Sequence, residues 1–242
     1  MTGSLSSKPQ KSLPMKPASK NGIRLPNLPK PLTSGPLTDL EDHETYSQQL
    51  FTGRDLSPAE NNITAYRSLA FDQVLFQRVS FLESKIGSLR MSDCRMEQSD
   101  LSAAVWMGAR LRRVELSGCR LLGTALAEGT LEDVLFQDCL AERANFSWAV
   151  FKNARFEKCD LREAAFLGAD LTGVVFRGCD LSRADLRDAR LVGADLRGAT
   201  LDGLKIGAKD LQGAVITLVQ AMQMMGLLGV QIKELDDANG GV

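Results

Sequence analysis

The residues of this chain best suited to chemistry are its five cysteines, and the last four recur at intervals of 20 residues. The five cysteines are Cys94, Cys119, Cys139, Cys159 and Cys179. Regularly spaced thiols could hold a metal ion or form cross-links. However, the chain has no C-x-x-C pair, and parallel side chains inside an apolar core do not turn easily toward one another. We therefore interpret the cysteines as small core residues and expect no metal site.

Other groups that could act in catalysis are scarce. The single histidine, His43, lies among acidic residues, and we interpret it as a solvated linker residue. The sequence contains no phosphate-binding G-x-x-x-x-G-K, no dinucleotide-binding fingerprint and no nucleophile elbow. We therefore predict a protein that is not an enzyme, with no catalytic residues and no cofactor.

A five-residue period runs from Tyr46 to Ile206. Of the 33 residue numbers in this range that end in 1 or 6, 31 carry a bulky apolar or aromatic side chain, the exceptions being Asn61 and Ala141. A period of five matches neither a helix, with its apolar period of about 3.6, nor a strand, with its period of 2. Glycine is frequent two residues after the bulky position, as at Gly168, which indicates a turn.

The sequence also repeats every 20 residues. Phe136, Phe156 and Phe176 are one such set, and the cysteines are another. In an extended segment, residues two apart share a face, so the bulky residue and the small residue two positions earlier both point inward. Four five-residue units then return the chain to its starting side. This predicts a filled rod of four-sided coils stacked about 4.8 Å apart.

The repeating unit is a small residue, then Asp or Asn, then Leu or Phe, then two further residues. It is clearest in GADLRGATL and CDLSRADLRDARL, and weaker before residue 90, where Lys85, Arg90 and Arg95 replace the Asp. This pattern resembles the pentapeptide-repeat family, whose fold is a right-handed quadrilateral β-helix. The resemblance implies an all-β solenoid over residues 46–208.

The segments outside the repeat differ in composition. Residues 1–36 contain seven of the eight prolines, six Lys or Arg and no acidic residue, which predicts a disordered basic tail. Residues 37–45 form an acidic junction. Residues 209–235 are predicted to be a C-terminal cap with a helix over about 218–228, because Thr217 and Gln220 have the spacing of a capping box and Gly229 is a helix stop. Residues 236–242 are predicted to be a flexible terminus.

Three sets of residues are candidates for contact with a partner. Outward apolar residues on one wall of the rod form a candidate lateral interface: Val105, Met107, Trp148 and Leu167. An apolar stripe on the C-terminal helix would cover the last coil or, as in some members of the family, form a homodimer: Leu218, Met222, Met225 and Leu228. Cations of the tail could contact an acidic surface: Lys8, Lys11, Lys16, Lys20, Arg24 and Lys30.

The charge and hydropathy of the chain limit its partners. The formal net charge is -1, and no stretch of 18 apolar residues or secretion signal is present, so we expect a cytoplasmic protein that binds neither membranes nor nucleic acid directly. We predict a non-enzymatic protein-binding or scaffold protein that uses the lateral faces of a rigid β-helix. The N-terminal tail is a second candidate binding element.

Two alternatives belong to other functional classes. Some members of the family imitate DNA and bind type II topoisomerases, so the resemblance implies gyrase protection or inhibition as the alternative. Residues 66–210, however, contain 21 Lys or Arg and 21 Asp or Glu, whereas duplex DNA carries one negative charge every ~1.7 Å. A neutral rod imitates DNA poorly. An enzyme that uses the cysteines for redox or metal chemistry ranks last.

Overall fold

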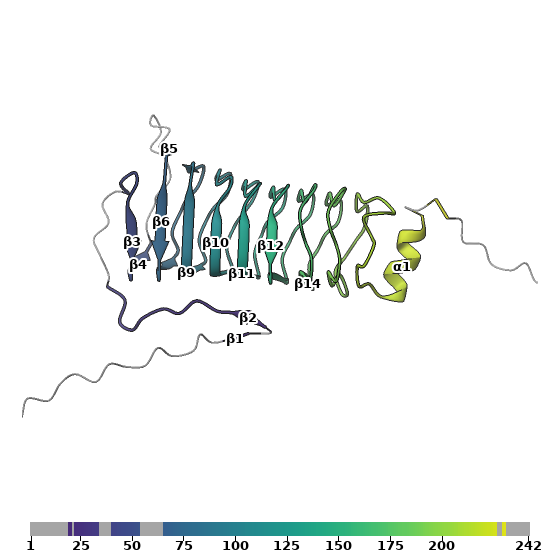
Figure 1. The fold of residues 1–242 in the computed structure, drawn as a ribbon, viewed down its shortest axis with the longest axis horizontal. Coiled ribbons are helices and arrows are strands. Elements are labelled where there is room, and N and C mark those ends of the chain that lie inside the picture. Colours follow the sequence, from purple (N-terminus) through teal and green to yellow (C-terminus); the bar gives the residue numbers. More distant parts are fainter. Residues whose placement is uncertain (1–18, 21, 34–39, 54–64, 227–228, 231–242) are drawn as a thin grey trace, which may run out of the picture.

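The structure is a computed structural model and describes residues 19–20, 22–33, 40–53, 65–226 and 229–230. Within these ranges the chain forms a rod of stacked coils with a helix at its C-terminal end (Figure 1). The strands are β1 (Ser19–Lys20), β2 (Ile23–Arg24), β3 (Thr45–Ser47), β4 (Leu50–Thr52), β5 (Ala65–Tyr66), β6 (Leu69–Asp72), β7 (Leu75–Gln77), β8 (Lys85–Ile86), β9 (Leu89–Glu97), β10 (Arg110–Ser117), β11 (Thr130–Gln137), β12 (Val150–Lys152), β13 (Arg155–Glu157) and β14 (Val175–Arg177), and the helix is α1 (Leu218–Met225).

Neighbouring coils pair in parallel with a register of 20 residues. Leu111 in β10 faces Leu131 in β11. On another side of the coil, where the extended segments are shorter, Val105 and Ala125 are joined by a parallel bridge in the same register. The predicted fold class is therefore confirmed: a four-sided parallel β-helix built from five-residue units.

The interior is filled by the side chains predicted to point inward. Phe136, Phe156 and Phe176 are fully buried and stacked in one column, with ring centroids 4.5 Å and 5.2 Å apart and interplanar angles of 5° and 3°. Trp106 is also buried, and its Nε1 donates a hydrogen bond to Oγ of Ser84 over 3.1 Å. These rings belong to the core and are not available to stack on a ligand.

The acidic residues of the repeat have a structural role at the corners. Oδ1 of Asp180 accepts a hydrogen bond from the backbone N–H of Ser182 over 2.9 Å, and Asp195 makes the same contact with Arg197 over 3.1 Å. A carboxylate that bonds the backbone two residues ahead stabilises a turn. The Asp of the repeat thus helps to shape the coil, which explains its regular recurrence without reference to catalysis.

The first coil is longer than the others. Tyr46 in β3 pairs with Phe71 in β6, and Phe51 in β4 pairs with Phe76 in β7, so both pairs are 25 residues apart. The 20-residue repeat predicted for the coils is therefore wrong for this coil, although its length is still a multiple of five. Residues 54–64, which include Asn61, lie outside the described residues.

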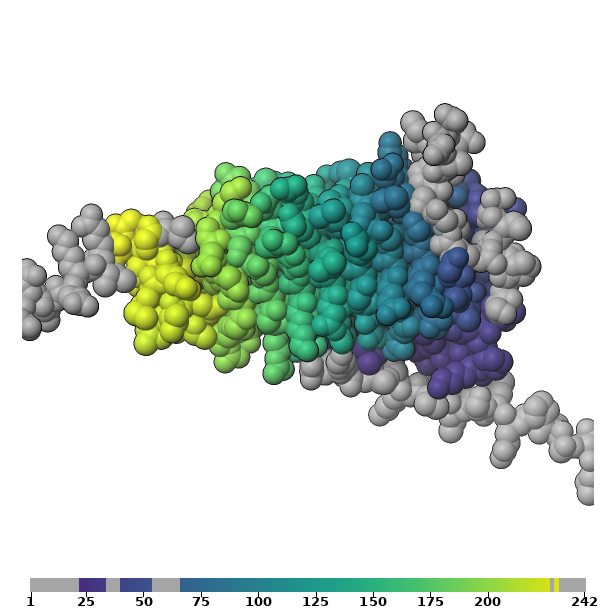
Figure 2. Space-filling view, turned by 180° about the vertical axis from the view of Figure 1, so that it is seen from behind, coloured from purple at the N-terminus to yellow at the C-terminus, as the bar shows by residue number. Residues whose placement is uncertain are grey.

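Part of the predicted tail is ordered against the rod. Residues 22–33 run along the coils, with β2 beneath β11 in Figure 1 and the N-terminal residues in purple against one edge in Figure 2. Ile23 is 1% exposed, and Thr33 pairs with Gln49 of the first coil. The prediction of disorder over residues 1–36 is therefore wrong for residues 22–33. Residues 1–18 lie outside the described residues.

The acidic junction predicted over residues 37–45 also belongs to the fold. Leu40 joins the hydrophobic core. Oδ1 of Asp42 accepts hydrogen bonds from the backbone N–H groups of Arg67 over 2.6 Å and Ser68 over 3.0 Å. Since the first coil of a solenoid has backbone groups without a preceding coil to pair with, these contacts cap its N-terminal end.

Candidate functional site

Two members of the predicted lateral interface line a shallow groove near the N-terminal end of the rod. Val105 and Met107 form its wall together with Tyr66, Ile86 and Gly87, and the groove has a volume of about 430 Å³. Met107 is 46% exposed. Val105 and Met107 contribute outward-facing side chains to this groove, whereas Ile86 at its base belongs to the core.

The other two members lie in later coils of the same wall. Trp148 is 59% exposed, and its indole lies against Gly168, where an added Cβ would overlap the ring. The backbone N–H of Trp148 donates a hydrogen bond to the carbonyl of Leu167 over 2.9 Å. A positive φ of 60° at Trp148 is rare for a bulky residue. The absence of a side chain at Gly168 therefore leaves room for the exposed indole to pack against the next coil.

These two groups belong to one continuous surface, here called the Trp148 face and defined by Val105, Met107, Trp148 and Leu167. Parallel bridges connect the successive coils between them, from Val105 to Ala125, on to Asn145 and then to Ala165. Three coil spacings of about 4.8 Å separate the two ends, a distance of roughly 14 Å. The four residues predicted to form one lateral patch therefore lie on one wall of the rod, in coils that are bridged to one another.

The C-terminal helix α1 attaches to the last coil by a different face from the one predicted. Gln220 and Met224 are its buried residues. Nε2 of Gln220 donates hydrogen bonds to the carbonyls of Leu196 and Ala199, both over 2.8 Å, so it satisfies backbone groups at the open end of the β-helix. The capping box of Thr217 and Gln220 is present as predicted.

The apolar stripe predicted on α1 does not cover the last coil. Leu218 is 77% exposed and Met222 is 51% exposed, whereas Met225 is half-buried. Leu228 lies outside the described residues, and the helix ends at Met225 rather than near residue 228. The expectation that this stripe seals the core is corrected, because Gln220 and Met224 do so. A homodimer through the stripe stays a prediction.

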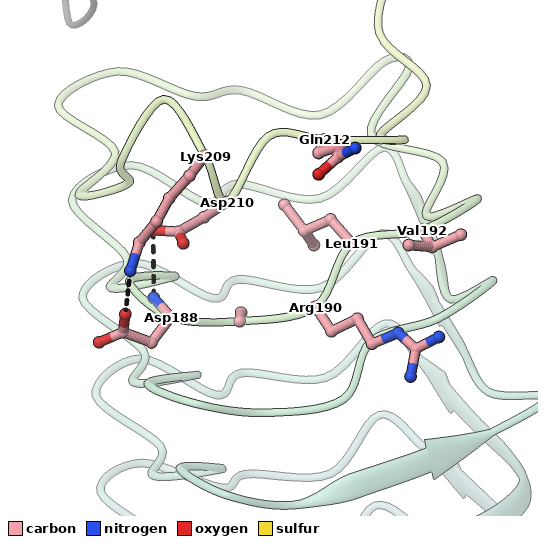
Figure 3. Close-up of a pocket in the computed structure, with 8 residues that line it drawn as sticks. Asp188, Arg190, Leu191, Val192, Lys209, Asp210 and Gln212 are labelled. Carbon is pink, nitrogen blue, oxygen red and sulfur yellow. Dashed lines mark hydrogen bonds and ion pairs between the residues drawn. The ribbon is translucent and has the colours of Figure 1, made fainter.

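A groove of about 450 Å³ opens where the last coil departs from the regular path (Figure 3). Nζ of Lys209 lies 3.0 Å from Oδ1 of Asp188, and Oδ2 of Asp210 accepts hydrogen bonds from the backbone N–H groups of Asp188 over 3.1 Å and Gly207 over 3.0 Å. Figure 3 shows Lys209 and Asp210 directed toward Asp188 and Arg190 pointing away from them. The acidic groups and Lys209 thus stabilise the end of the β-helix.

The cysteines lie in the core as predicted, and none of the five is more than 2% exposed. Sγ of Cys139 lies 3.5 Å from the carbonyl oxygen of Leu116. Burial raises the pKa of Cys94 to about 12. Hydrogen bonds with Cys119 and Cys159, together with burial, raise the pKa of Cys139 well above its usual value. Because the thiolate is the reactive form, the raised pKa values make Cys94 and Cys139 poorly suited to nucleophilic or redox chemistry. Hydrogen bonds with Cys139 lower the pKa of Cys119 and Cys159, and these two thiols are kept from reagents by their burial.

Other chemistry-bearing groups of the described residues are dispersed. Nε2 of His43 lies 3.4 Å from Oδ2 of Asp42 at the exposed N-terminal end of the rod. Within the described ranges, no group of three or more His, Cys, Asp or Glu side chains is arranged to hold a metal ion. No helix in the described part of the chain is long and apolar enough to cross a membrane.

A second surface, which was not predicted from the sequence, holds residues 22–33, here called the strap. This surface, here called the ladder, consists of five polar side chains at intervals of 20 residues: Gln73, Asp93, Arg113, Asp133 and Asn153. All five have φ between 51° and 57°. Such angles favour glycine, and in the two coils beyond the strap the same position is Gly173 and Gly193. Polar side chains occupy this column only in the coils that the strap crosses, which is the signal that could have revealed the surface.

The N-terminal part of the strap is held by charge. Nε of Arg24 donates to Oδ2 of Asp133 over 2.7 Å, and its NH2 group donates to Glu132 over 3.3 Å. Nδ2 of Asn153 donates to Oδ1 of Asp133 over 2.6 Å and to the carbonyl of Gly22 over 3.0 Å. The hydrogen bond with Asp133 raises the pKa of Arg24 above its ordinary value. Arg24, predicted as a tail contact, thus binds an acidic site on its own chain.

The middle of the strap is held through its backbone. Arg113 donates two hydrogen bonds to the carboxylate of Asp93. The N–H of Asn27 donates to Oδ1 of Asp93 over 3.0 Å, and Nε2 of Gln73 donates to the carbonyl of Asn27 over 3.1 Å. Burial alone would raise the pKa of Asp93, but the hydrogen bonds from Arg113 and Asn27 outweigh it and hold this pKa below its usual value. Asp93 is therefore ionised at neutral pH.

The remaining predicted tail cations are placed differently. Lys30 lines a space of about 500 Å³ between the strap and the rod, together with Leu32, Leu50 and Leu75. Lys20 belongs to β1. The other three lie outside the described residues: Lys8, Lys11 and Lys16. Contact between these cations and a partner stays a prediction.

Several solved structures resemble this chain at low sequence identity, whereas no curated protein matches it. HetL, a pentapeptide repeat protein involved in heterocyst differentiation regulation from the cyanobacterium Nostoc sp. strain PCC 7120, is 22% identical, with 72% of this chain and 87% of that chain covered and a TM-score of 0.39. Full-length QnrB1, a plasmid-mediated fluoroquinolone resistance protein, is 17% identical, with 77% and 99% covered and a TM-score of 0.34. Rfr23 from the cyanobacterium Cyanothece 51142 is 18% identical, with 72% and 91% covered and a TM-score of 0.23.

A family model agrees with the repeat seen in the structure. The model for the pentapeptide repeat region matches residues 90–166 and 109–186. These ranges contain β10, β11 and the stacked Phe column, where the five-residue units and the register of 20 residues are regular. Residues 90–186 of this chain therefore form a pentapeptide repeat region.

Proposed function

We propose that this protein is a non-enzymatic binding or scaffold protein whose β-helix presents the Trp148 face to a protein partner. The observation that carries the proposal is the exposed indole of Trp148, which is held against Gly168 on a wall of hydrogen-bonded coils. Tryptophan is enriched among the residues that dominate binding energy at protein interfaces. A ring that already packs against the protein loses less conformational entropy when a partner covers it than a freely rotating ring would.

The groove beside Met107 supports the same proposal. It provides an apolar depression of about 430 Å³ along the wall from Trp148, into which a side chain of a partner could insert. Aromatic and aliphatic residues that fill such depressions are typical of the centre of a protein interface. The buried thiols and the paired charges of the C-terminal groove do not favour an enzymatic function over the proposed binding function.

The DNA-mimic alternative is not favoured by the charges of the rod. Residues 66–210 contain equal numbers of cationic and anionic residues, 21 of each. Many of them pair with each other across coils, as Arg143 does with Glu163 over 2.9 Å and Arg162 with Glu142 over 3.0 Å. A surface with this balance lacks the continuous negative potential of a duplex.

Two further parts of the proposal concern assembly and location. The exposed Leu218 and Met222 of α1 would form the contact in a homodimer, which would display two copies of the Trp148 face. We place the interaction in the cytoplasm, in keeping with the composition of the chain. Both statements stay predictions.

Replacement of Trp148 by alanine is the direct test. Loss of a central tryptophan costs an interface about 2 kcal/mol or more, which corresponds to roughly thirtyfold weaker binding. Affinity capture with the full chain, quantified by mass spectrometry, should therefore yield a partner that is retained by the unaltered protein and depleted with Trp148→Ala. Leu140→Ala is the matched control, because Leu140 is 51% exposed and lies on the preceding wall.

The proposal is contradicted if every protein captured by the unaltered chain is captured equally by Trp148→Ala. Thermal unfolding should show that both variants keep the fold, since each removes an exposed side chain. A gyrase supercoiling assay with the purified protein separates the two functional classes. Inhibition at stoichiometric amounts would favour the DNA-mimic alternative and overturn the proposal.

A further inference from the structure

We propose that the ladder is a peptide-binding surface that the strap occupies in the isolated chain. Its external ligand is an extended segment of another protein, in which an aliphatic residue directly precedes an arginine. Within each coil, the ladder lies at the next corner along the chain after the corner that carries Trp148. The ladder is therefore separate from the Trp148 face. The proposal goes beyond the function proposed above and does not depend on it.

The ladder recognises features that any extended peptide offers. Asp93 accepts the N–H of Asn27, Gln73 donates to the carbonyl of the same residue, and Asn153 donates to the carbonyl of Gly22. These are contacts with the backbone of the strap, so they do not depend on its side chains. Side chains that bond an extended backbone provide affinity, as main-chain bonds do in other modes of peptide recognition.

Two further contacts provide sequence specificity. The carboxylates of Asp133 and Glu132 both bind the guanidinium of Arg24. The side chain of Asp133 is 1% exposed, so a peptide without a cation here would leave a buried carboxylate without its counter-charge. Ile23 is 1% exposed and packs against the rod at the adjacent position. A ligand therefore needs an aliphatic residue followed by arginine.

The geometry fits a linear ligand. The strap spans the ladder between Gly22 and Asn27, a separation of five residues that covers about 17 Å when extended. The ladder residues at the two ends of this contact, Asn153 and Asp93, lie three coils apart, which is roughly 14 Å. The length of the extended strap segment thus roughly matches the separation of the coils that it crosses, so the strap needs no turn to reach successive ladder residues. Glycine replaces the ladder beyond Asn153, where the strap no longer lies on the rod.

The strap is placed to act as an exchangeable occupant. The side chain of Arg24 in the strap is 52% exposed, and the C-terminal end of the strap is tethered to the first coil through Thr33. A tethered segment competes with an external one at a high effective concentration. The apparent affinity for an external peptide is therefore reduced by the fraction of molecules in which the ladder is vacant. Weakening the strap should reveal the external site.

The test uses a fluorescein-labelled synthetic peptide, SKNGIRLPNLPK, which has the sequence of residues 19–30. Its binding is measured by fluorescence anisotropy to three forms of the full chain. These are the unaltered chain, a released chain with Ile23→Ser and Arg24→Ser, and the released chain with Asp133→Asn added. A control peptide carries Glu at the position of Arg24. A second released chain carries only Arg24→Ser, in case the double change is harmful.

We expect the released chain to bind the peptide at least about tenfold more tightly than the unaltered chain, because its ladder is vacant. Asp133→Asn should abolish this gain, and the control peptide should not bind. Equal binding by the unaltered and released chains would overturn the proposal, as would binding that survives Asp133→Asn or the Glu peptide. Loss of the β-sheet circular dichroism signal in both released chains would also overturn it, since the ladder would then not exist without its strap.

Discussion

Replacement of Phe156 by alanine is expected to lower the free energy of unfolding by about 3–5 kcal/mol, the usual range for removal of a buried aromatic side chain. Phe156 is fully buried and stacks between Phe136 and Phe176. It also meets Phe146 edge to face, with ring centroids 5.8 Å apart. The column continues on both sides of the cavity, so the neighbouring coils cannot close it without losing their own hydrogen-bonded register.

Denaturant unfolding followed by circular dichroism measures this effect. Leu140→Ala is the control, since the side chain of Leu140 is 51% exposed and its loss should change stability by no more than about 0.5 kcal/mol. A loss below about 1 kcal/mol for Phe156→Ala would contradict the stacked core. Because each coil contacts mainly its neighbours, the transition should also broaden if the two halves of the rod unfold separately.

Asp93→Ala is expected to lower the free energy of unfolding by about 3 kcal/mol. The side chains of Arg113 and Asp93 are 15% and 10% exposed. Removal of the carboxylate therefore leaves the guanidinium largely buried without its partner, and breaking a buried pair in this way is strongly destabilising. The N–H of Asn27 also loses its acceptor, so backbone amides in the strap should exchange hydrogen faster.

A double-mutant cycle tests whether the pair acts as a unit. Arg113→Ala and the double variant are measured beside Asp93→Ala under the same conditions. The double variant should be less destabilised than the sum of the two single changes, because neither charge is then left unpaired. Additive losses would show that Asp93 and Arg113 do not interact, and unchanged exchange in the strap would show that Asp93 does not hold it.

The core of the fold could be predicted from the sequence because the core residues recur at fixed positions of the five-residue unit. The inward position of Phe136 and Phe156, the 20-residue register and the burial of the cysteines all follow from the alternation of side chains in extended segments. The Trp148 face could be predicted for the same reason, since outward positions are defined once inward ones are known. The contact between the ring of Trp148 and Gly168 needed the structure, because it depends on which residues meet across coils.

The strap was missed because composition describes an average over a segment. Proline and lysine dominate residues 1–36 and indicate disorder. The attachment depends on a few residues, above all Ile23 and Arg24, and on partners more than 100 positions away, such as Asp133. The orientation of α1 was missed because the apolar stripe of Leu218 and Met222 was assumed to face the core. Gln220 faces it instead, since backbone carbonyls at the end of the β-helix need a donor.

The most direct test of the central claim is a titration of accessible thiols in the native protein. That claim is that the aromatic and sulfhydryl side chains fill the interior of a four-sided coil, which leaves only its outer surface for recognition. All five cysteines are at most 2% exposed, so none should react rapidly with a thiol reagent in the native protein at neutral pH, and all five should react after denaturation. Rapid modification of one or more cysteines in the native protein would contradict it.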